Sequence, residues 1–272
     1  VKGKYGEEEK PLFILRFPRY PDNAEANRSL ENEYKSLSLV QQKLKGSNIA
    51  QAIPQALFYD TVLGSKFLVI SFLSGKDSVS SLGAGDLMKS FIGLFAKSFA
   101  WKEEFDKEWG RTENIIDEQF IKTYAADEIE LYKKTFPQSA PRFEQYLNKI
   151  MEISKKHLGE KISVLPQHVD FHASNIFLLE GRVSGVIDWE DFEENGMPCF
   201  DLFHFIKTLV EAFYENAASR GDLNFVISLS EDQGWLQAVR SLAEQYSRSA
   251  GVDPSQWEML IPLFIIKSQN IA

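Results

Sequence analysis

The strongest constraint on the fold is a hairpin pattern in the second half of the chain. Two apolar runs, IFLL at 176–179 and VSGVI at 183–187, lie on either side of a glycine-containing turn at 180–182. This pattern predicts two antiparallel strands joined by a short turn. Asn175 precedes the first run and Asp188 follows the second, so antiparallel pairing brings these two polar residues close together.

More oxygen-bearing side chains gather around this hairpin. Asp170 lies five residues before Asn175, and Glu190 lies two residues after Asp188. Phosphoryl transfer needs a carboxylate to accept a hydroxyl proton, oxygen ligands for Mg²⁺ and a cation for the phosphates that stay behind. Because Mg²⁺ prefers hard oxygen ligands, we assign Asn175 and Asp188 as metal ligands, with Glu190 as an additional one, and Asp170 as the base.

The cation comes from the first part of the chain. A strand is predicted at 11–17, and a helix follows at about 24–45, because its apolar residues recur at helical spacing. Glu33 falls on the apolar stripe of this helix, and Arg16 lies on the strand before it. Either Arg16 pairs with a buried Glu33 and serves as the phosphate-binding cation, or Glu33 lies at the edge of the stripe in solvent.

The remaining segments divide the chain into two regions. Two further strands at 56–60 and 65–73 complete a strand-rich region, with residues 1–4 as another strand before a charged turn, GEEEK. After Gly75 the chain becomes mostly helical, with amphipathic segments at 84–108, 116–135, 139–158, 199–219, 233–249 and 254–269. We therefore expect an α+β fold of two lobes, a nucleotide-binding lobe at 1–74 and a helical catalytic and substrate lobe at 75–272.

Composition excludes several functional classes. The chain has 272 residues and 44% hydrophobic residues, enough for two lobes with their own cores. A net charge of -9 is the wrong sign for binding a nucleic-acid backbone. The longest apolar runs, 67–73 and 260–266, are shorter than the ~20 residues of a membrane helix. The single cysteine, Cys199, excludes an internal disulfide and is typical of the cytoplasm. The oligomeric state has no sequence signal.

These motifs resemble those of one family. His168, Asp170 and Asn175 fit an H-x-D-x4-N catalytic loop, and the segment IDWED at 187–191, followed by Gly196, Pro198 and Asp201-Leu202, is similar to a metal-binding segment. Upstream, ILRFPR, ENEYKSL and VISFLSG resemble a third strand, a glutamate-bearing helix and a hinge. Together they resemble the aminoglycoside phosphotransferase and choline kinase group over residues 11 to about 205.

The resemblance implies a bilobal, protein-kinase-like fold that binds ATP or another nucleoside triphosphate with Mg²⁺. Asp170 would be the catalytic base, and Asn175 and Asp188 would bind the metal. The backbone of Ser71 to Leu73 would face the adenine. His168 and Asp201 would support the catalytic loop, and the partner would be a small molecule with a hydroxyl acceptor, such as an aminoglycoside, choline or a sugar.

The chain departs from the family pattern at three places. Val169 stands where the family often has glycine, and Ala173-Ser174 stand where it has proline-glycine, which predicts a less tightly turned loop. Arg16 replaces the commoner lysine. The chain begins inside what the resemblance makes the second strand, with no glycine-rich phosphate-covering loop in the sequence.

Two alternatives stay open. The arginine and the lack of a glycine-rich loop favour a degenerate kinase fold that binds or regulates without turnover. The alternating residues His168, Asp170 and His172 would share one face of a strand, and such a pattern can bind the metal of a hydrolase.

Overall fold

The structure is a computed structural model that describes residues 2–5, 8–18, 20, 23–79, 87–213, 226 and 234–271. The chain divides into two compact units, each built from two separate segments. Unit 1 comprises Val1–Trp109 and His168–Glu193, and unit 2 comprises Gly110–Gln167 and Glu194–Ala272. The functional division into lobes at 1–74 and 75–272 stays a prediction.

Unit 1 contains the predicted strand-rich region. An antiparallel sheet has the order β3-β5-β4, formed by Phe13–Arg16, Ser65–Ser71 and Ala56–Val62. A separate antiparallel hairpin joins β1 (Lys2–Tyr5) to β2 (Glu8–Pro11). The strand predicted at the start of the chain is confirmed. The prediction of a turn at GEEEK was wrong at its end, because Glu8–Pro11 pair with β1 instead of staying irregular.

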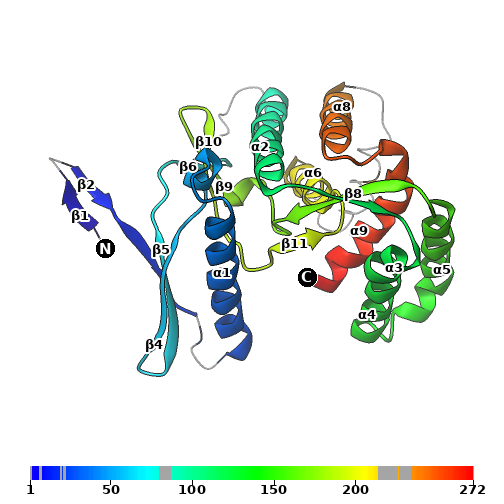
Figure 1. Cartoon of the computed structure of the whole chain (residues 1–272), viewed down its shortest axis with the longest axis horizontal. Coiled ribbons are helices and arrows are strands. Elements are labelled where there is room, and N and C mark those ends of the chain that lie inside the picture. Colours follow the sequence, from blue (N-terminus) through cyan, green and yellow to red (C-terminus); the bar gives the residue numbers. More distant parts are fainter. Residues whose placement is uncertain are drawn as a thin grey trace. The chain divides into compact units, whose positions relative to one another are not determined.

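Helix α1 (Ala24–Lys43) lies beside the β3-β5-β4 sheet (Figure 1). It begins after Asn23, whose side chain accepts hydrogen bonds from two backbone N–H groups of the first turn, the usual work of an N-cap residue. Its buried face carries Leu30, Leu37 and Val40, as the helical spacing predicts, and Glu33 lies on the same face. The short 3-10 helix η1 (Asn48–Ala52) follows α1.

A cluster of aromatic side chains forms much of the core of unit 1. Helix α2 (Leu87–Trp109) supplies Phe99, Trp101, Phe105 and Trp109, which are buried. Their rings contact Phe171, Trp189 and Phe192 from the segment after residue 168, with centroid separations of 5.2 to 6.5 Å. This packing fixes the 168–192 segment against α2, because such aromatic contacts bury large areas.

The predicted hairpin is confirmed. Strands β9 (Ile176–Leu179) and β10 (Arg182–Val186) pair antiparallel, with an irregularity between Val183 and Gly185. Strand β6 (Lys76–Asp77) pairs with the outer edge of β9. At the open end of the hairpin the Ile187 N–H donates to the carbonyl of Asn175 over 3.0 Å, so the chain on either side of the two strands is held together.

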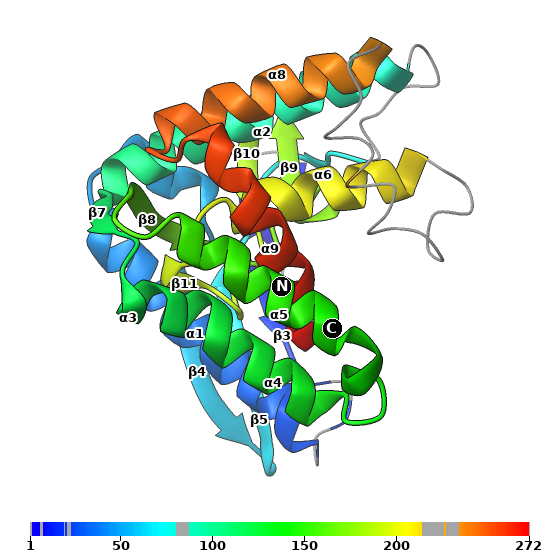
Figure 2. The same ribbon diagram turned by 90° about the vertical axis from the view of Figure 1, so that its right-hand side faces the viewer.

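In its described residues, unit 2 is mainly helical with a small three-stranded sheet (Figure 2). Its helices are α3 (Glu118–Ile121), the π-helix η2 (Lys122–Ala126), α4 (Asp127–Thr135), α5 (Ala140–Lys156), α6 (Phe200–Phe213), α8 (Gly234–Ser249), η5 (Pro254–Gln256) and α9 (Trp257–Ile271). The sheet has the order β11-β8-β7, from Glu193–Gly196, Lys161–Gln167 and Thr112–Ile115. The predicted helices are confirmed where the structure describes them; residues 84–86, 214–219 and 233 of the predicted ranges lie outside the described residues.

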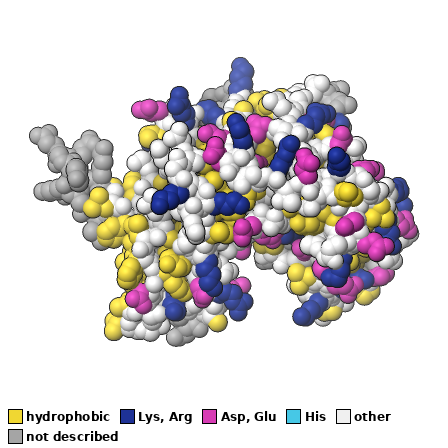
Figure 3. All heavy atoms as spheres, viewed as in Figure 1, with side chains coloured by type: hydrophobic (Ala, Val, Ile, Leu, Met, Phe, Trp, Pro, Cys, Tyr) yellow, Lys and Arg dark blue, Asp and Glu magenta, His cyan; other side chains and the backbone are white. Residues whose placement is uncertain are grey.

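Apolar side chains also lie on the surface of unit 1. Figure 3 shows hydrophobic side chains gathered over the β3-β5-β4 sheet. Phe17 and Phe58 are half exposed, and both rings contact Phe67 at about 6 Å. In the described part of the chain, no helix is both long enough and apolar enough to span a bilayer.

Candidate active site

The centre of the site is an arginine between two carboxylates, all within unit 1. Arg16 Nη1 donates to Oε1 of Glu33 and to Oδ1 of Asp188, the second over 2.8 Å. The Glu33 side chain is fully buried, so the alternative of a solvated Glu33 at the edge of the stripe was wrong. A buried carboxylate requires a cation, and the strand before α1 supplies it.

The charges around Arg16 shift the pKa values of the pair. Burial raises the pKa of Glu33 to about 7, although the Arg16 charge opposes this shift. Glu33 Oε2 has no hydrogen-bond partner among the described residues, which adds to the cost of ionising this carboxyl group. Burial disfavours the charged form of Arg16, but Glu33, Asp188 and Glu190 outweigh it and raise the pKa of the guanidinium.

Asp188 reaches Arg16 because of an unusual backbone conformation. The residue follows β10 and has a φ of 63°, in the left-handed region that few residues other than glycine adopt. Its side chain is 33% exposed, so it faces both the Arg16 guanidinium and solvent. Glu190, two residues further on, accepts a hydrogen bond from the hydroxyl of Ser29 on α1. The segment after the hairpin is therefore tied to β3 and to α1.

Asp170 and Asn175 form a second pair of oxygen-bearing side chains. Asn175 Nδ2 donates to Asp170 Oδ2 over 2.8 Å and to the Asp170 carbonyl over 3.0 Å. Both hydrogens of the side-chain nitrogen are used, which leaves the side-chain oxygen of Asn175, Oδ1, as the atom of this amide that can bind a cation. Asn175 is buried, whereas the Asp170 side chain is 41% exposed and accessible to a small molecule.

The donor set fits Mg²⁺. Asn175, Asp188 and Glu190 offer only carboxylate and amide oxygens, and magnesium sites typically combine one or two carboxylates with substrate phosphates and water. Among the described residues, no three His, Cys, Asp or Glu side chains gather to hold a metal by themselves. The set is therefore suited to a metal that arrives with phosphates.

That finding also weighs against the hydrolase alternative. His172 Nε2 lies 3.4 Å from Asp170 Oδ1, but His168 is buried with its ring 4.6 Å from that of Trp189. In the described ranges, His168, Asp170 and His172 do not form a metal-binding group. The prediction that these three residues share one face was wrong, because strand β8 ends at Gln167 and the chain bends at Val169 and Asp170.

The loop before Asn175 has a distinct backbone conformation at both places where the chain departs from the family pattern. Val169 adopts a φ of 73°, a conformation that is costly for a β-branched residue and explains why glycine would be suitable there. Ala173–Asn175 form a 3-10 turn, and His172 Nδ1 accepts a hydrogen bond from the Ser174 N–H. The neutral His172 ring therefore carries its hydrogen on Nε2, toward Asp170.

The two supporting residues lie in different surroundings. His168 packs against Trp189 inside unit 1, at the start of the loop. Asp201 is fully buried in unit 2, and its N–H donates to Oε1 of Gln167 over 2.9 Å. Because Gln167 immediately precedes His168, this bond anchors the chain where it enters the loop.

The hinge residues differ in their available backbone groups. The Ser71 N–H donates to the carbonyl of Gln55, and the Phe72 N–H donates to that of Leu12. The next residue, Leu73, is buried and makes no hydrogen bond within the described part of the chain. Of the two predicted hinge residues, Leu73 therefore retains a backbone donor for a ligand and Ser71 does not.

Sequence reasoning missed Ser29 as a partner of Glu190. Ser29 lies four residues before Glu33, so both project from one face of α1. That spacing could have identified Ser29. The contact of His172 with Asp170 could not be derived from the sequence pattern.

Two comparisons bear on this geometry. Streptomyces rimosus aminoglycoside phosphotransferase APH(3'')-Id, in complex with ADP and streptomycin, is 15% identical, covers 94% of this chain and 87% of its own, and has a TM-score of 0.51. A second structure of the same enzyme is 14% identical, covers 94% of this chain and 86% of its own, and has a TM-score of 0.50. Among curated proteins, no sequence matches the chain.

The family match and the fold define the class: an α+β, kinase-like phosphotransferase. The profile of the family described as "Phosphotransferase enzyme family" matches residues 6–235, and the chain belongs to that family.

Proposed function

We propose that the protein moves the γ-phosphate of ATP, or of another nucleoside triphosphate, to a hydroxyl of a small molecule in a Mg²⁺-dependent reaction. The observation that carries the proposal is the Arg16 guanidinium held between Glu33 and Asp188, with Asn175 bonded to Asp170 in the same unit. A cation, a base and oxygen ligands are the parts that phosphoryl transfer needs.

Asp170 is the catalytic base in this proposal. Its Oδ2 is held by the Asn175 amide and its Oδ1 lies near His172 Nε2, so the carboxylate is oriented before a substrate arrives. As the acceptor oxygen attacks the γ-phosphorus, its proton passes to Asp170 and the bond to the leaving nucleoside diphosphate breaks. His168 and Asp201 support the loop without contacting the substrate.

Arg16 binds the phosphates that are not transferred, and Glu33 holds it in place. The guanidinium also donates a hydrogen bond to Asp188. Phosphate oxygens would take the place of Asp188 as its partner, which frees Asp188 to join Asn175, and secondarily Glu190, in holding Mg²⁺. Bound Mg²⁺ would supply charge neutralisation between the phosphate groups. The adenine would contact the hinge at Ser71 and Leu73, with the free backbone donor on Leu73.

The proposed acceptor is an aminoglycoside-, choline- or sugar-like hydroxyl compound. A net charge of -9 and the acidic segment at 188–194 would attract the cationic members of this set, whereas a neutral sugar would depend on other contacts. The Streptomyces rimosus relative was solved with streptomycin. We propose a cytoplasmic location, where ATP is available, and no membrane or nucleic-acid partner.

One observation favours a second candidate, a binding module without turnover. Arg16 pairs directly with a proposed metal ligand, Asp188, and this pairing competes with metal binding. Thermal melting with ATP and Mg²⁺, compared with ATP and EDTA, separates the two candidates. A kinase is stabilised by the metal-nucleotide complex, and no stabilisation with a longer chain that includes any preceding residues would favour the module.

Turnover is tested by a coupled ADP-release screen over hydroxyl acceptors. Asp170→Asn should lower the rate by about 100-fold or more, since general-base catalysis contributes at least that much. Glu152→Gln, which removes an exposed acid on helix α5, is the matched control and should leave the rate unchanged. A near-native rate for Asp170→Asn would remove Asp170 from the base role.

A further inference from the structure

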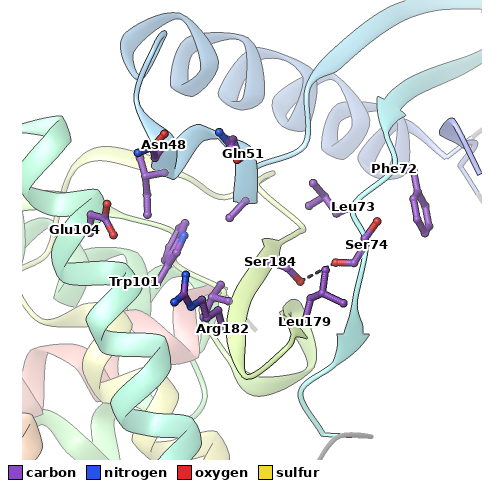
Figure 4. Close-up of a pocket in the computed structure, with 13 residues that line it drawn as sticks. Asn48, Gln51, Phe72, Leu73, Ser74, Trp101, Glu104, Leu179, Arg182 and Ser184 are labelled. Carbon is purple, nitrogen blue, oxygen red and sulfur yellow. Dashed lines mark hydrogen bonds between the residues drawn. The ribbon is translucent and has the colours of Figure 1, made fainter.

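A second concave region lies within unit 1. A pocket of about 560 Å³ is lined by η1, the hinge at 72–74, helix α2 and the turn of the β9–β10 hairpin (Figure 4). Its lining includes none of Arg16, Glu33, Asp170, Asn175 or Asp188. The pocket and the proposed site of phosphoryl transfer therefore share only the hinge.

One polar group in its wall lacks a partner. Trp101 on α2 is 7% exposed, and its Nε1–H makes no hydrogen bond to any described residue. The two other tryptophans whose Nε1–H bonds are known do have acceptors: Trp189 donates to the Val186 carbonyl over 2.8 Å and Trp257 donates to Ser247 Oγ over 3.0 Å. A buried N–H normally has an acceptor, so Trp101, a residue of the pocket lining, holds an unused donor.

The indole ring itself is firmly held. Trp101 stacks with Phe105 at 5.4 Å and with Phe171 at 6.0 Å between ring centroids. The donor is therefore fixed in orientation before any ligand arrives, which lowers the entropic cost of binding.

The rest of the lining defines the ligand chemistry. Apolar side chains such as Leu73, Leu179 and Val183 form one part of the wall, which suits a flat apolar body. Figure 4 shows Glu104 and Arg182 near Trp101, and both residues are exposed. Because the charges of Glu104 and Arg182 are opposite, this pair selects neither an anion nor a cation. The amide side chains of Asn48 and Gln51 on η1 can both donate and accept hydrogen bonds.

We propose that this pocket is a binding site for a small uncharged aromatic or heterocyclic carboxamide, whose carbonyl oxygen accepts the Trp101 Nε1–H bond. The ligand body lies against the hinge and hairpin residues. Such a ligand is not a substrate for the proposed phosphoryl transfer, because the proposed base Asp170 is not part of the pocket.

The pocket is positioned to affect the hinge. Ser184 Oγ donates to the Ser74 carbonyl over 2.7 Å, and a Cβ placed on Gly185 would lie 3.0 Å from Leu73 Cδ1. A ligand that displaces these closely packed groups would move Leu73. If the proposed nucleotide contact at Leu73 is correct, the carboxamide should change the affinity for ADP, a consequence that rests on the proposed function.

The test uses benzamide as the probe and the full chain labelled with ¹⁵N. The Nε1–H signal of Trp101, assigned with Trp101→Phe, should shift saturably with a Kd of about 1 mM, the range expected for so small a ligand. The signals of Trp189 and Trp257 are internal controls and should not move, because both donors are already satisfied. Toluene, which has no acceptor, should bind about 5- to 10-fold more weakly.

Charged analogues and variants complete the test. Benzoate and benzylamine should bind no better than benzamide. Trp101→Phe keeps an aromatic ring in the stack, should melt within a few degrees of the native protein, and should weaken benzamide binding about 5- to 10-fold. No saturable Trp101 shift with benzamide, equal affinity for toluene, or unchanged benzamide affinity in folded Trp101→Phe would overturn the proposal.

One variant separates the carboxamide site from the proposed phosphoryl transfer. Asp188→Ala should abolish Mg²⁺-dependent ADP binding and leave the benzamide affinity unchanged. If the native protein binds no ADP in the presence of Mg²⁺, the proposed function is contradicted but the carboxamide site is not. If it binds no benzamide, the carboxamide site is contradicted but the proposed function is not.

Discussion

Replacing Glu33 with glutamine should make stability less sensitive to pH. The Glu33 carboxyl group is fully buried and its pKa is raised by burial to about 7, compared with 4.5 for an unperturbed glutamate. Between these values the folded protein binds a proton that the unfolded chain has released. The free energy of unfolding must therefore fall as pH rises through this window. Glutamine resembles the protonated side chain and has no such dependence.

The size of the effect follows from the shift. A difference of 7 minus 4.5, or 2.5 units, corresponds to about 3 kcal/mol at pH values above both pKa values. Between pH 5 and pH 8 the native protein should lose about 2.5 kcal/mol relative to Glu33→Gln. The loss is a cost of keeping the charge that orients Arg16, so the variant should be more stable at pH 8 and bind ADP more weakly.

Urea unfolding of both proteins from pH 5 to pH 8 measures this difference. Glu31→Gln is the control on the same helix: Glu31 is exposed and bonded to Lys35, which lowers its pKa, so this variant should show no such gain at high pH. A difference between native protein and Glu33→Gln that does not change with pH would show that Glu33 titrates normally. A native protein that gains stability with rising pH would show that the Arg16 charge outweighs burial.

Two further predictions concern unit 1 outside the site. Gly75→Ala should destabilise the fold by about 2 kcal/mol or more, since Gly75 has a φ of 136° and the new Cβ would lie 2.9 Å from the Leu178 carbonyl oxygen. Gly46→Ala is the control. Gly46 has a φ of 89° but no atom within 4 Å of a new Cβ, so this variant should cost only about 1 kcal/mol in the same urea assay. Lys102→Met should cost about 3 to 5 kcal/mol, because it removes the Lys102 cation that is bonded to the buried Asp106. Adding Asp106→Leu should recover most of the loss; equal stability of single and double variants would refute this account.

Much of the fold could be predicted where the apolar residues follow a single period, that of a strand or that of a helix. The hairpin at 176–186 and helix α1 each have an apolar pattern that admits a single element. The β11-β8-β7 sheet of unit 2 was not predicted. Residues 162–167 of β8 are buried on both faces, so the segment has no alternation, and Pro166 argues against a strand.

The residues of the candidate site could be predicted from the sequence, but the hydrogen bonds between them could not. The stripe on α1 and the hairpin ends indicate that Arg16, Glu33, Asn175 and Asp188 come from two segments of one site. The bond from Arg16 to Asp188 depends on a positive φ at Asp188, which no sequence pattern of a non-glycine residue indicates. The Asn175 to Asp170 bond likewise depends on the turned loop, not on spacing.

The interleaved construction of the two units has a consequence for synthesis on the ribosome. The chain leaves unit 1 after Trp109, returns at His168 and leaves again after Glu193. Domains usually fold in order as they emerge, but unit 1 cannot close its aromatic core or pair Arg16 with Asp188 until residue 193 has been made. Until then the aromatic face of α2 is uncovered, so a nascent chain stalled between these points should be a target for chaperones that bind exposed apolar segments.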